Sequence, residues 1–297
     1  MKKALIIFNP TAGLVSRQDV RGLVEKKLKE LGFDWELFLL NSEFEKNISS
    51  FDFSGLKLVV AVGGDGTIKV AARTILKNKL TCPLAVVPFG SANVIASTLA
   101  IPISIKEALK LLDKPSTKKI DVGLINGNRY FLVGFSLGYI SDIVINTGKG
   151  LKNRFGMLGY FWRLFFNKIR ISRLKFKIQT RNRTFWLKGN SLIIFNAFNY
   201  FGFRPKRPIS ISDGIFNLYV ITNKTFFSLI RAGFYILLYH QPPRYVFTLD
   251  NNFFRITLRR QHFLKTAQID GDHLNLPREI IIEVLPRALE MVVKNNG

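Results

Sequence analysis

The stretch from Leu56 to Lys69 reads LKLVVAVGGDGTIK, and it decides how the first part of the chain folds. Its apolar beginning, Leu56–Val62, predicts a buried strand, and Thr67–Asn78 predicts the helix that follows. Between them lie three glycines, one carboxylate and one hydroxyl. Glycine lets a backbone approach a phosphate closely, and a helix N-terminus adds a partial positive charge. The stretch therefore predicts a loop that binds an anionic group, with Asp65 placed to hold a magnesium ion or to orient a polar group.

The same alternation of strand and helix runs through the first ~115 residues, as in a parallel sheet covered on both faces. We expect strands at Ala4–Phe8, Trp35–Leu40, Leu56–Val62 and Leu84–Val87, and helices at Asp19–Leu31, at Thr67–Asn78 and after Asn93. Ligands of such sheets bind at the carboxyl ends of the strands. Three glycine-bearing loops fall at these ends: Asn9–Gly13, Gly63–Thr67 and Pro88–Asn93.

From about Lys118 the pattern changes to short strands at close spacing, which is typical of an antiparallel sandwich. We expect strands at Ile120–Leu124, Asn128–Ser136, Arg173–Gln179, Thr184–Lys188, Ser191–Asn196, Ile215–Ile221, Phe253–Leu258, Thr266–Ile269 and Ile280–Val284. Two helices are expected between them, at Phe155–Arg170 and Phe226–Tyr239. The predicted fold class is thus α/β, with an α/β domain over residues 1–118, to which residues 286–297 return, and a β-sandwich domain over residues 119–285.

Length and composition agree with a folded chain in a reducing compartment. The 297 residues fit about two domains, and 47% apolar with 22% charged residues is ordinary for globular proteins. The single Cys82 excludes a disulfide framework within the chain. No signal peptide and no apolar run of membrane-spanning length are found. We expect a cytoplasmic protein, peripherally associated with the inner face of the membrane.

The charge is strongly basic and unevenly placed. Net charge is +24, and between Ile143 and Ser212 fifteen Lys or Arg stand against no Asp or Glu. Such a tract is attracted to a polyanion, either nucleic acid or an anionic membrane surface. No sequence signature of a nucleic-acid module is present, so we expect a membrane partner and no nucleic acid. The apolar stripe of Phe155–Arg170, with Trp162 and cationic flanks, is a candidate interfacial helix.

Several chemistries are excluded by missing motifs. The chain lacks the G-x-x-x-x-G-K-[ST] phosphate loop, the G-x-G-x-x-G fingerprint with an acidic partner, and the protein-kinase motif set. His240, His262 and His273 share no metal-ligand spacing. Asp213-Gly214 and Asp270-Gly271 are sequences typical of hairpin turns, and Asp121 is compatible with a residue that closes a strand.

The order of the motifs resembles the diacylglycerol kinase catalytic-domain family, in its bacterial branch that also contains relatives of sphingosine kinases. The motifs are Asn9-Pro10-x-Ala12-Gly13, Gly63-Gly64-Asp65-Gly66-Thr67, Pro88-x-Gly90-Ser91-Ala92-Asn93, Asp121-x-Gly123, Asp213-Gly214 and Asp270-Gly271-Asp272. The second motif is shared with NAD kinases and phosphofructokinase-like folds. The resemblance implies a Rossmann-like or phosphofructokinase-like nucleotide-binding domain, followed by a β-sandwich domain for the lipid.

The resemblance also implies a role for each motif. ATP would be held by Asn9, Pro10, Thr11, Ala12, Gly13, Gly63, Gly64, Asp65, Gly66, Thr67, Ile68, Lys69, Gly90, Ser91 and Asn93. Asp65 and Asp121 resemble aspartates that organise Mg²⁺ through water. Asp65, Asp270 and Asp272 would be catalytic, with Asp270 resembling the carboxylate that takes the proton of the lipid hydroxyl. Asp213, with the backbone of Ser210 and Ile215, resembles a structural metal loop.

The sequence departs from the family pattern at three positions. Asp272 replaces the Glu of the family's Asp-Gly-Glu, which leaves open which carboxylate acts as the base. Val94 stands where an Asp often follows the third motif, and Lys69 stands where an Asn often follows the second.

The expected function is an ATP- and Mg²⁺-dependent lipid kinase that phosphorylates a membrane lipid hydroxyl, most simply that of diacylglycerol. A soluble-substrate kinase of the NAD kinase type is one alternative, although the later half lacks its second dinucleotide loop. A non-catalytic nucleotide- or membrane-binding protein is another, since Val94 removes an acid. The sequence does not decide between a monomer and a homodimer.

Overall fold

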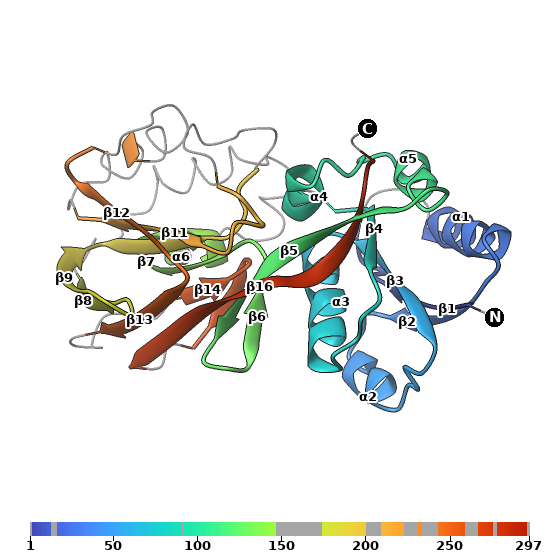
Figure 1. The fold of residues 1–297 in the computed structure, drawn as a ribbon, viewed down its shortest axis with the longest axis horizontal. Helices are drawn as coiled ribbons and strands as arrows, with labels where there is room; N and C mark the ends of the chain where they lie inside the picture. Colours follow the sequence, from blue (N-terminus) through green and yellow to red (C-terminus); the bar gives the residue numbers. More distant parts are fainter. Residues whose placement is uncertain are drawn as a thin grey trace. The chain divides into compact units, whose positions relative to one another are not determined.

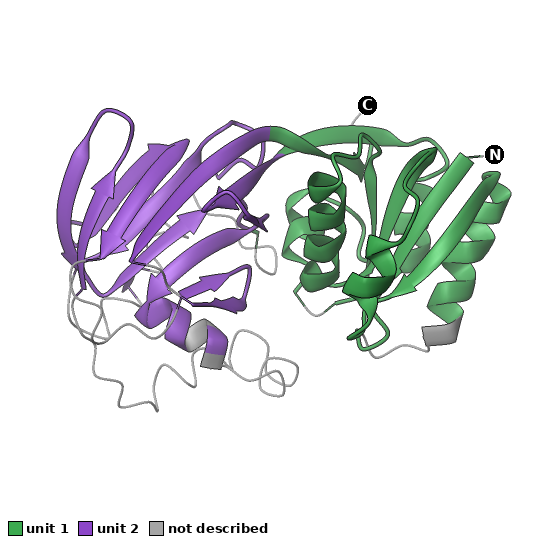
Figure 2. Ribbon diagram, turned by 90° about the horizontal axis from the view of Figure 1, so that it is seen from below, with its two compact units in different colours: residues 1–120, 199–202, 287–297 green, residues 121–198, 203–286 purple. Residues whose placement is uncertain are grey.

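The computed structural model describes residues 2–12, 17–90, 92–146, 174–199, 209–222, 231–232, 243–258, 267–275 and 278–295. The chain divides into two compact units, coloured separately in Figure 2. Unit 1 comprises residues 1–120, 199–202 and 287–297, and unit 2 comprises residues 121–198 and 203–286.

Unit 1 is built on four parallel strands in the order β2-β1-β3-β4 (Figure 1). Its strands are β1 (Lys2–Phe8), β2 (Phe33–Leu39), β3 (Leu56–Gly63) and β4 (Leu84–Pro88). Its helices are α1 (Arg17–Glu30), α2 (Phe44–Ser49), α3 (Asp65–Lys77), α4 (Val94–Thr98) and α5 (Ile105–Lys110). The parallel sheet predicted from the sequence is confirmed.

The core of unit 1 explains this arrangement. Alternate residues of β1 and β3 pack against one stripe of α1; they are Ala4, Ile6, Phe8, Leu58, Val60 and Val62, facing Val20, Val24 and Leu28. The intervening residues of the two strands are buried as well. A strand that is buried on both sides needs cover on both faces. Figure 2 shows helices on both sides of the unit 1 sheet.

Unit 2 is a pair of largely antiparallel sheets, as the strand spacing predicts. One sheet has the order β12-β11-β10-β7-β14-β15, and β16, β13, β8 and β9 are neighbours in the other. The elements are β5 (Ser116–Ile125), β6 (Arg129–Phe131), β7 (Gly134–Gly138), α6 (Tyr139–Asn146), β8 (Leu174–Gln179), β9 (Thr184–Gly189), β10 (Ser191–Phe195), β11 (Phe216–Ile221), β12 (Val246–Asn251), β13 (Phe253–Leu258), β14 (Ala267–Ile269), β15 (Asp272–Leu274) and β16 (Glu279–Val293).

One apolar core lies between the two sheets of unit 2. Every second residue of the strands enters it, for example Phe176 and Ile178 of β8 and Phe254 and Ile256 of β13. The period of two places the residues between them on the opposite face. This is the sandwich expected from the sequence.

Two expectations about strands are wrong. The expected strand Asn128–Ser136 is interrupted between β6 and β7, because the Leu132 and Val133 N–H groups bond to a side chain instead of to a strand. The expected strand Ile280–Val284 is part of a longer strand, β16, which runs on to Val293 and carries a positive φ of 52° at Arg287. The strands β5 and β16 both continue from one unit into the other.

The expected helix Phe155–Arg170 lies outside the described residues, and of Phe226–Tyr239 only residues 231–232 are described, as helix. Among the described helices, none combines the length and the apolar character needed to cross a membrane.

Candidate active site

The second glycine loop is a strand end that turns directly into a helix. β3 ends at Gly63, Gly64 is the N-cap, and α3 begins at Asp65. The N–H groups of Thr67 and Ile68 donate to the Gly64 carbonyl at 2.9 and 3.1 Å. The first N–H groups of a helix have no acceptor within it. Gly64, Asp65 and Gly66 therefore present their N–H groups at the carboxyl end of β3.

Two of the predicted nucleotide ligands in this loop have a different side-chain role. The side chains of Thr67 and Ile68 are fully buried, so they belong to the core. A Cβ added to Gly63 would lie 2.2 Å from Thr67 Oγ1, so Gly63 must be glycine for Thr67 to pack. The buried Thr67 hydroxyl oxygen has no hydrogen-bond partner among the described residues.

The third glycine loop packs against the second, glycine to glycine. A Cβ on Gly90 would lie 2.5 Å from the Gly64 Cα, so the two backbones approach too closely for a side chain. Asn93 holds this loop: its Oδ1 accepts from Gly90 N–H at 3.1 Å and its Nδ2 donates to the Gly90 carbonyl at 2.8 Å. Asn93 is buried and adopts φ 48°, so its side chain shapes the loop. Ser91 lies outside the described residues.

Asp65 joins the two loops. Its Oδ1 accepts a hydrogen bond from the Ile95 N–H at 3.1 Å, in the first turn of α4. Asn93, the N-cap of α4, makes no capping bond with its side chain. Asp65 thus supplies the acceptor that a helix N-terminus needs, and the half-buried carboxylate lies at the start of α3. Lys69, one turn later, is also half-buried.

The first glycine loop is closed by its own asparagine. Asn9 Oδ1 accepts from both the N–H and the hydroxyl of Thr11, at 2.9 Å each. The Asn9 N–H donates to the Val62 carbonyl of β3 at 3.0 Å. β1, β3 and β4 are neighbours and parallel, so the loops that follow them meet at one edge of the sheet. The predicted positions Pro10, Thr11 and Ala12 lie there, and Gly13 is outside the described residues.

In unit 2, Asp270 and Gly271 form the turn of the β14–β15 hairpin. Both have positive φ, 48° and 87°, the combination of a two-residue type I′ turn. The Asp270 carboxylate does more than close this turn. Its Oδ1 accepts from the N–H groups of Val133 and Gly134 at 2.9 Å each, and its Oδ2 accepts from Leu132 N–H at 2.8 Å. Three backbone amides therefore fix the orientation of the carboxylate.

A glutamine that the sequence analysis did not select clamps the same turn. Gln268 Oε1 accepts from Gly271 N–H at 2.5 Å, and its Nε2 donates to Ser136 Oγ at 2.9 Å. Ser136 is fully buried and shares a 2.8 Å hydrogen bond with the buried Ser141 hydroxyl. The only signal in the sequence is an amide side chain in a short apolar strand, two residues before Asp270.

The predicted metal residues of unit 2 gather on a second turn. Asp121 is fully buried, and its Oδ2 accepts from Gly214 N–H at 2.6 Å. Asp213 Oδ1 accepts from Ile215 N–H at 3.2 Å, and Ser210 Oγ accepts from Ser212 N–H at 3.3 Å. Burial raises the pKa of the Asp213 carboxyl; the Ile215 N–H opposes this, and the charge of Asp121 adds to it. Within the described ranges, no group of three or more His, Cys, Asp or Glu is placed to hold a metal ion.

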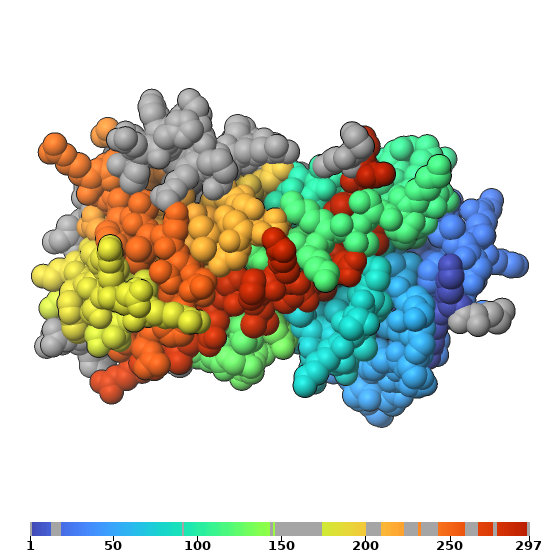
Figure 3. Space-filling model, in the orientation of Figure 1, coloured from blue at the N-terminus to red at the C-terminus, as the bar shows by residue number. Residues whose placement is uncertain are grey.

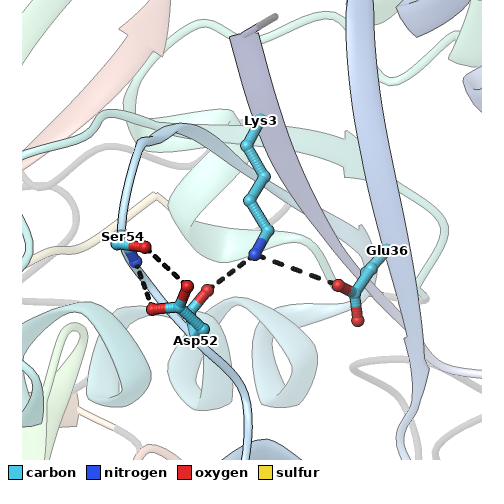
Figure 4. Close-up of polar contacts among 4 residues, drawn as sticks. All are labelled: Lys3, Glu36, Asp52 and Ser54. Atoms are coloured by element: carbon cyan, nitrogen blue, oxygen red, sulfur yellow. Dashed lines mark hydrogen bonds and ion pairs between the residues drawn. The ribbon is translucent and has the colours of Figure 1, made fainter.

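A polar groove of about 530 Å³ lies on unit 1 between β2 and α2. No glycine loop lines it. Figure 4 shows Lys3 in this region, donating to the Asp52 carbonyl at 2.7 Å and lying 3.9 Å from the Glu36 carboxylate. The Ser54 hydroxyl and N–H donate to the Asp52 carboxylate and lower its pKa. Because none of its lining residues belongs to the three glycine loops, the groove is not part of the candidate site.

Comparison with known proteins gives matches to diacylglycerol kinases and to a relative named as a lipid kinase. Residues 3–125 match the model of the diacylglycerol kinase catalytic domain. A relative from Streptococcus pneumoniae serotype 4, named "Putative lipid kinase", is 29% identical over 238 residues, which cover 78% of this chain and 79% of the relative. A diacylglycerol kinase of Staphylococcus aureus (strain JH9) is 26% identical over 227 residues, which cover 74% of this chain and 70% of the relative.

A solved structure of a diacylglycerol kinase from Bacillus anthracis str. Sterne has a TM-score of 0.74 and 21% identity, covering 99% of this chain and 97% of that one. This likeness shows that the fold is shared. Residues 3–125 thus match a diacylglycerol kinase catalytic domain, and the chain is similar over 74–78% of its length to relatives named as lipid kinases.

Proposed function

We propose that the chain is an ATP- and Mg²⁺-dependent kinase that phosphorylates the hydroxyl of a membrane lipid. Diacylglycerol, which would become phosphatidate, is the simplest acceptor, and a sphingoid base or related lipid alcohol has the same reacting group. ATP would supply the phosphoryl group, and Mg²⁺ would neutralise charge on the phosphate oxygens. The remaining contribution of the protein is to position these groups.

One observation carries this proposal: the fold has no need for a glycine at position 66. A Cβ on Gly66 would meet nothing within 4 Å, and the residue is exposed in the first turn of α3. Packing accounts for glycine at Gly63 and Gly90, as described above. A glycine on an open surface beside the first N–H groups of a helix is what close approach of a phosphate requires.

The aspartates suit a hard cation. Asp65 would hold Mg²⁺ beside the glycine loops. Asp121 resembles a second aspartate that organises Mg²⁺ through water in the family. Burial raises the pKa of the Asp213 carboxyl, with a smaller contribution from the charge of Asp121, and a divalent cation bound with the Ser210 and Ile215 backbone would favour the ionised carboxylate. Carboxylates, carbonyl oxygens and waters are the ligands that Mg²⁺ and Ca²⁺ prefer.

A carboxylate of the β14–β15 hairpin would accept the proton of the lipid hydroxyl. Three backbone amides hold the Asp270 carboxylate in one orientation, so a hydroxyl that bonds to it would be oriented too. Asp272 is exposed on the same hairpin and offers a second carboxylate. The lipid would be met at an anionic membrane surface, which the basic tract of unit 2 would attract.

The test is a transfer assay with γ-labelled ATP, Mg²⁺ and a lipid extract, followed by separation of the lipid products. We expect a labelled phospholipid that is lost without Mg²⁺. Asp65→Asn should lower the rate about a hundredfold or more, because it removes the negative charge that would hold Mg²⁺ beside the phosphates. The new amide keeps an oxygen for the Ile95 N–H, so the thermal midpoint should not change.

Two results would contradict the proposal. One is labelled NAD or another soluble product with no labelled lipid. The other is full activity in Asp65→Asn, which would remove Asp65 from the reaction. The variants Asp270→Asn and Asp272→Asn, compared in the same assay, identify the base. It is the aspartate whose replacement abolishes turnover while ATP binding stays normal.

A further inference from the structure

The outer face of the β8–β9 hairpin carries cations around an exposed tryptophan. We name Lys175, Lys177, Trp186 and Lys188 the basic hairpin face. In the antiparallel register Lys175 lies opposite Lys188, and Lys177 lies opposite Trp186. Residues directly opposite in such a pair point to the same side of the sheet. The four side chains therefore form one surface.

This surface is open, whereas the other side of the hairpin is packed. Phe176 and Ile178 are fully buried in the core of unit 2, and Phe185 and Leu187 pack against it. Lys175, Trp186 and Lys188 are exposed. Figure 3 shows this part of the chain, in yellow, at the molecular surface.

The charges of the hairpin are unbalanced. Residues 174–189 contain five Lys or Arg and no Asp or Glu, counting Arg181 and Arg183 at the exposed turn. None of the five forms an ion pair within the part of the chain that the structure describes. On the next strand, Arg255 is paired with Glu279 at 3.6 Å, so the uncompensated charge is concentrated on the hairpin.

Two features of the basic hairpin face do not stabilise the folded chain on its own. Lysines placed directly opposite one another repel, as Lys175 and Lys188 do here. Trp186 is 60% exposed, the most of any large apolar side chain in the described residues. Lysines on an edge strand can prevent aggregation of one sheet with another. An exposed tryptophan side chain does not have that effect. Both features become favourable when the face meets an anionic, partly apolar surface.

The geometry points to the basic hairpin face as a docking surface for an anionic phospholipid membrane. Phosphate headgroups between Lys175 and Lys188 would relieve their repulsion. Trp186, with Lys177 Nζ 5.6 Å from its ring centroid, would enter the headgroup level, where tryptophan is enriched. This inference rests on the proposed function in one respect: a kinase that acts on lipid must reach a bilayer.

A nucleic acid offers the same charge, and aromatic side chains on basic sheets also stack on bases. The membrane is favoured because the proposed substrate is a membrane lipid and the chain is similar to a relative named as a lipid kinase. Competition by a single-stranded oligonucleotide decides between the two.

The experiment measures cosedimentation with phosphatidylcholine vesicles, with and without phosphatidylglycerol. The full chain should bind only the anionic vesicles. The triple variant Lys175→Gln, Lys177→Gln, Lys188→Gln should bind on the order of a hundredfold more weakly, from about fivefold per charge near an anionic surface. The matched control changes three exposed lysines of unit 1, Lys26, Lys46 and Lys106, to Gln and should bind like the parent chain.

A second measurement does not depend on loss of binding. A variant with Trp186 as its only tryptophan (Trp35→Phe, Trp162→Phe) should be quenched by brominated lipid in anionic vesicles. A variant that keeps only the half-buried Trp35 should not be quenched. Unchanged vesicle binding of the triple variant, an unquenched Trp186, or displacement from vesicles by the oligonucleotide would each overturn the inference.

Kinase assays distinguish a failure of the membrane-docking inference from a failure of the proposed function. With lipid substrate in neutral detergent micelles, the triple variant should be as active as the parent chain, and only its activity on anionic vesicles should fall. If the parent chain is inactive in micelles, the proposed function fails, whatever the vesicle binding shows.

Discussion

The glycines of the candidate nucleotide site differ in what makes them necessary. At Gly63 and Gly90 a Cβ would collide with Thr67 and with Gly64, respectively. At Gly66 a Cβ would meet nothing. The first two positions are fixed by packing, and among the described glycines of these loops Gly66 is the one left for a ligand to explain.

Gly66→Ala should therefore separate binding from stability. Alanine is favoured over glycine inside a helix by about 0.5–1 kcal/mol, so the free energy of unfolding should stay the same or rise slightly. The added methyl group should obstruct the phosphates and raise the Kd for ATP about tenfold or more, the equivalent of about 1.4 kcal/mol. Calorimetric titration with ATP and a thermal melt measure the two effects. A variant with unchanged ATP affinity would show that no phosphate approaches Gly66.

Gly90→Ala provides the contrasting case. Its Cβ would lie 2.5 Å from the Gly64 Cα and 2.9 Å from Asn93 Oδ1, so both loops must move. We expect a loss of about 1–3 kcal/mol in unfolding free energy, as for other overpacked sites, together with weaker ATP binding. Chemical denaturation measures the loss. Wild-type stability in this variant would mean that the two loops are not in the contact described.

At the scale of elements, the β14–β15 hairpin depends on partners far away in the sequence. Its turn is held by the Leu132–Gly134 amides on one side and by Gln268 on the other. The same amides interrupt the strand that the sequence predicts over Asn128–Ser136. Local periodicity cannot reveal this, because the acceptor, Asp270, is more than 130 residues away. The hairpin turn itself is predictable, since Asp-Gly is a strong local signal.

Gln268 is expected to act as a positioning residue for Asp270. Gln268→Leu should lower kcat on lipid on the order of tenfold to a hundredfold and leave the KM for ATP unchanged, because the turn loses its clamp. Gln268→Glu keeps an acceptor for the Gly271 N–H and should restore part of kcat. Equal kcat in both variants, with only the melting temperature lowered, would assign the residue a purely structural role.

Helix α6 carries a carboxyl whose ionisation opposes folding. Burial raises the pKa of Asp142, against the preference of a helix N-terminus for negative charge. A raised folded-state pKa gives stability that is present below the ordinary Asp range and is lost as the pH rises through the raised value. Asp142→Asn should therefore melt higher than the parent chain at neutral pH, and the difference should shrink in acid. A difference that is independent of pH would contradict this.

At the scale of the whole molecule, the two units differ in how far the sequence predicts them. Three strands of the unit 1 sheet, β1, β3 and β4, are predictable because they are buried on both faces and read as apolar runs. In unit 2, β12 and β15 were not expected: β12 contains a charged residue and only its first residue is buried, and β15 is three residues long. Short helices such as α2 and α5 were missed for a similar reason, since six residues give too few turns to show a period.

The candidate site, too, is predictable from the sequence only in part. The loops that carry chemistry are recognisable, because glycines cluster with polar residues directly after the apolar strands. The roles of individual side chains are not, because they depend on packing: Thr67 and Ile68 are core residues, and Asn93 braces its own loop. Gln268 was missed because its partners, Ser136 and Gly271, are brought to it only by the fold.

The most direct test of the nucleotide site is a crystal structure of the chain with Mg²⁺ and a non-hydrolysable ATP analogue. We expect the triphosphate to lie against the N–H groups of Gly64–Gly66, at the carboxyl ends of β1, β3 and β4. A nucleotide found elsewhere, for example in the groove between β2 and α2, or no bound nucleotide at saturating concentration, would contradict the assignment of these loops.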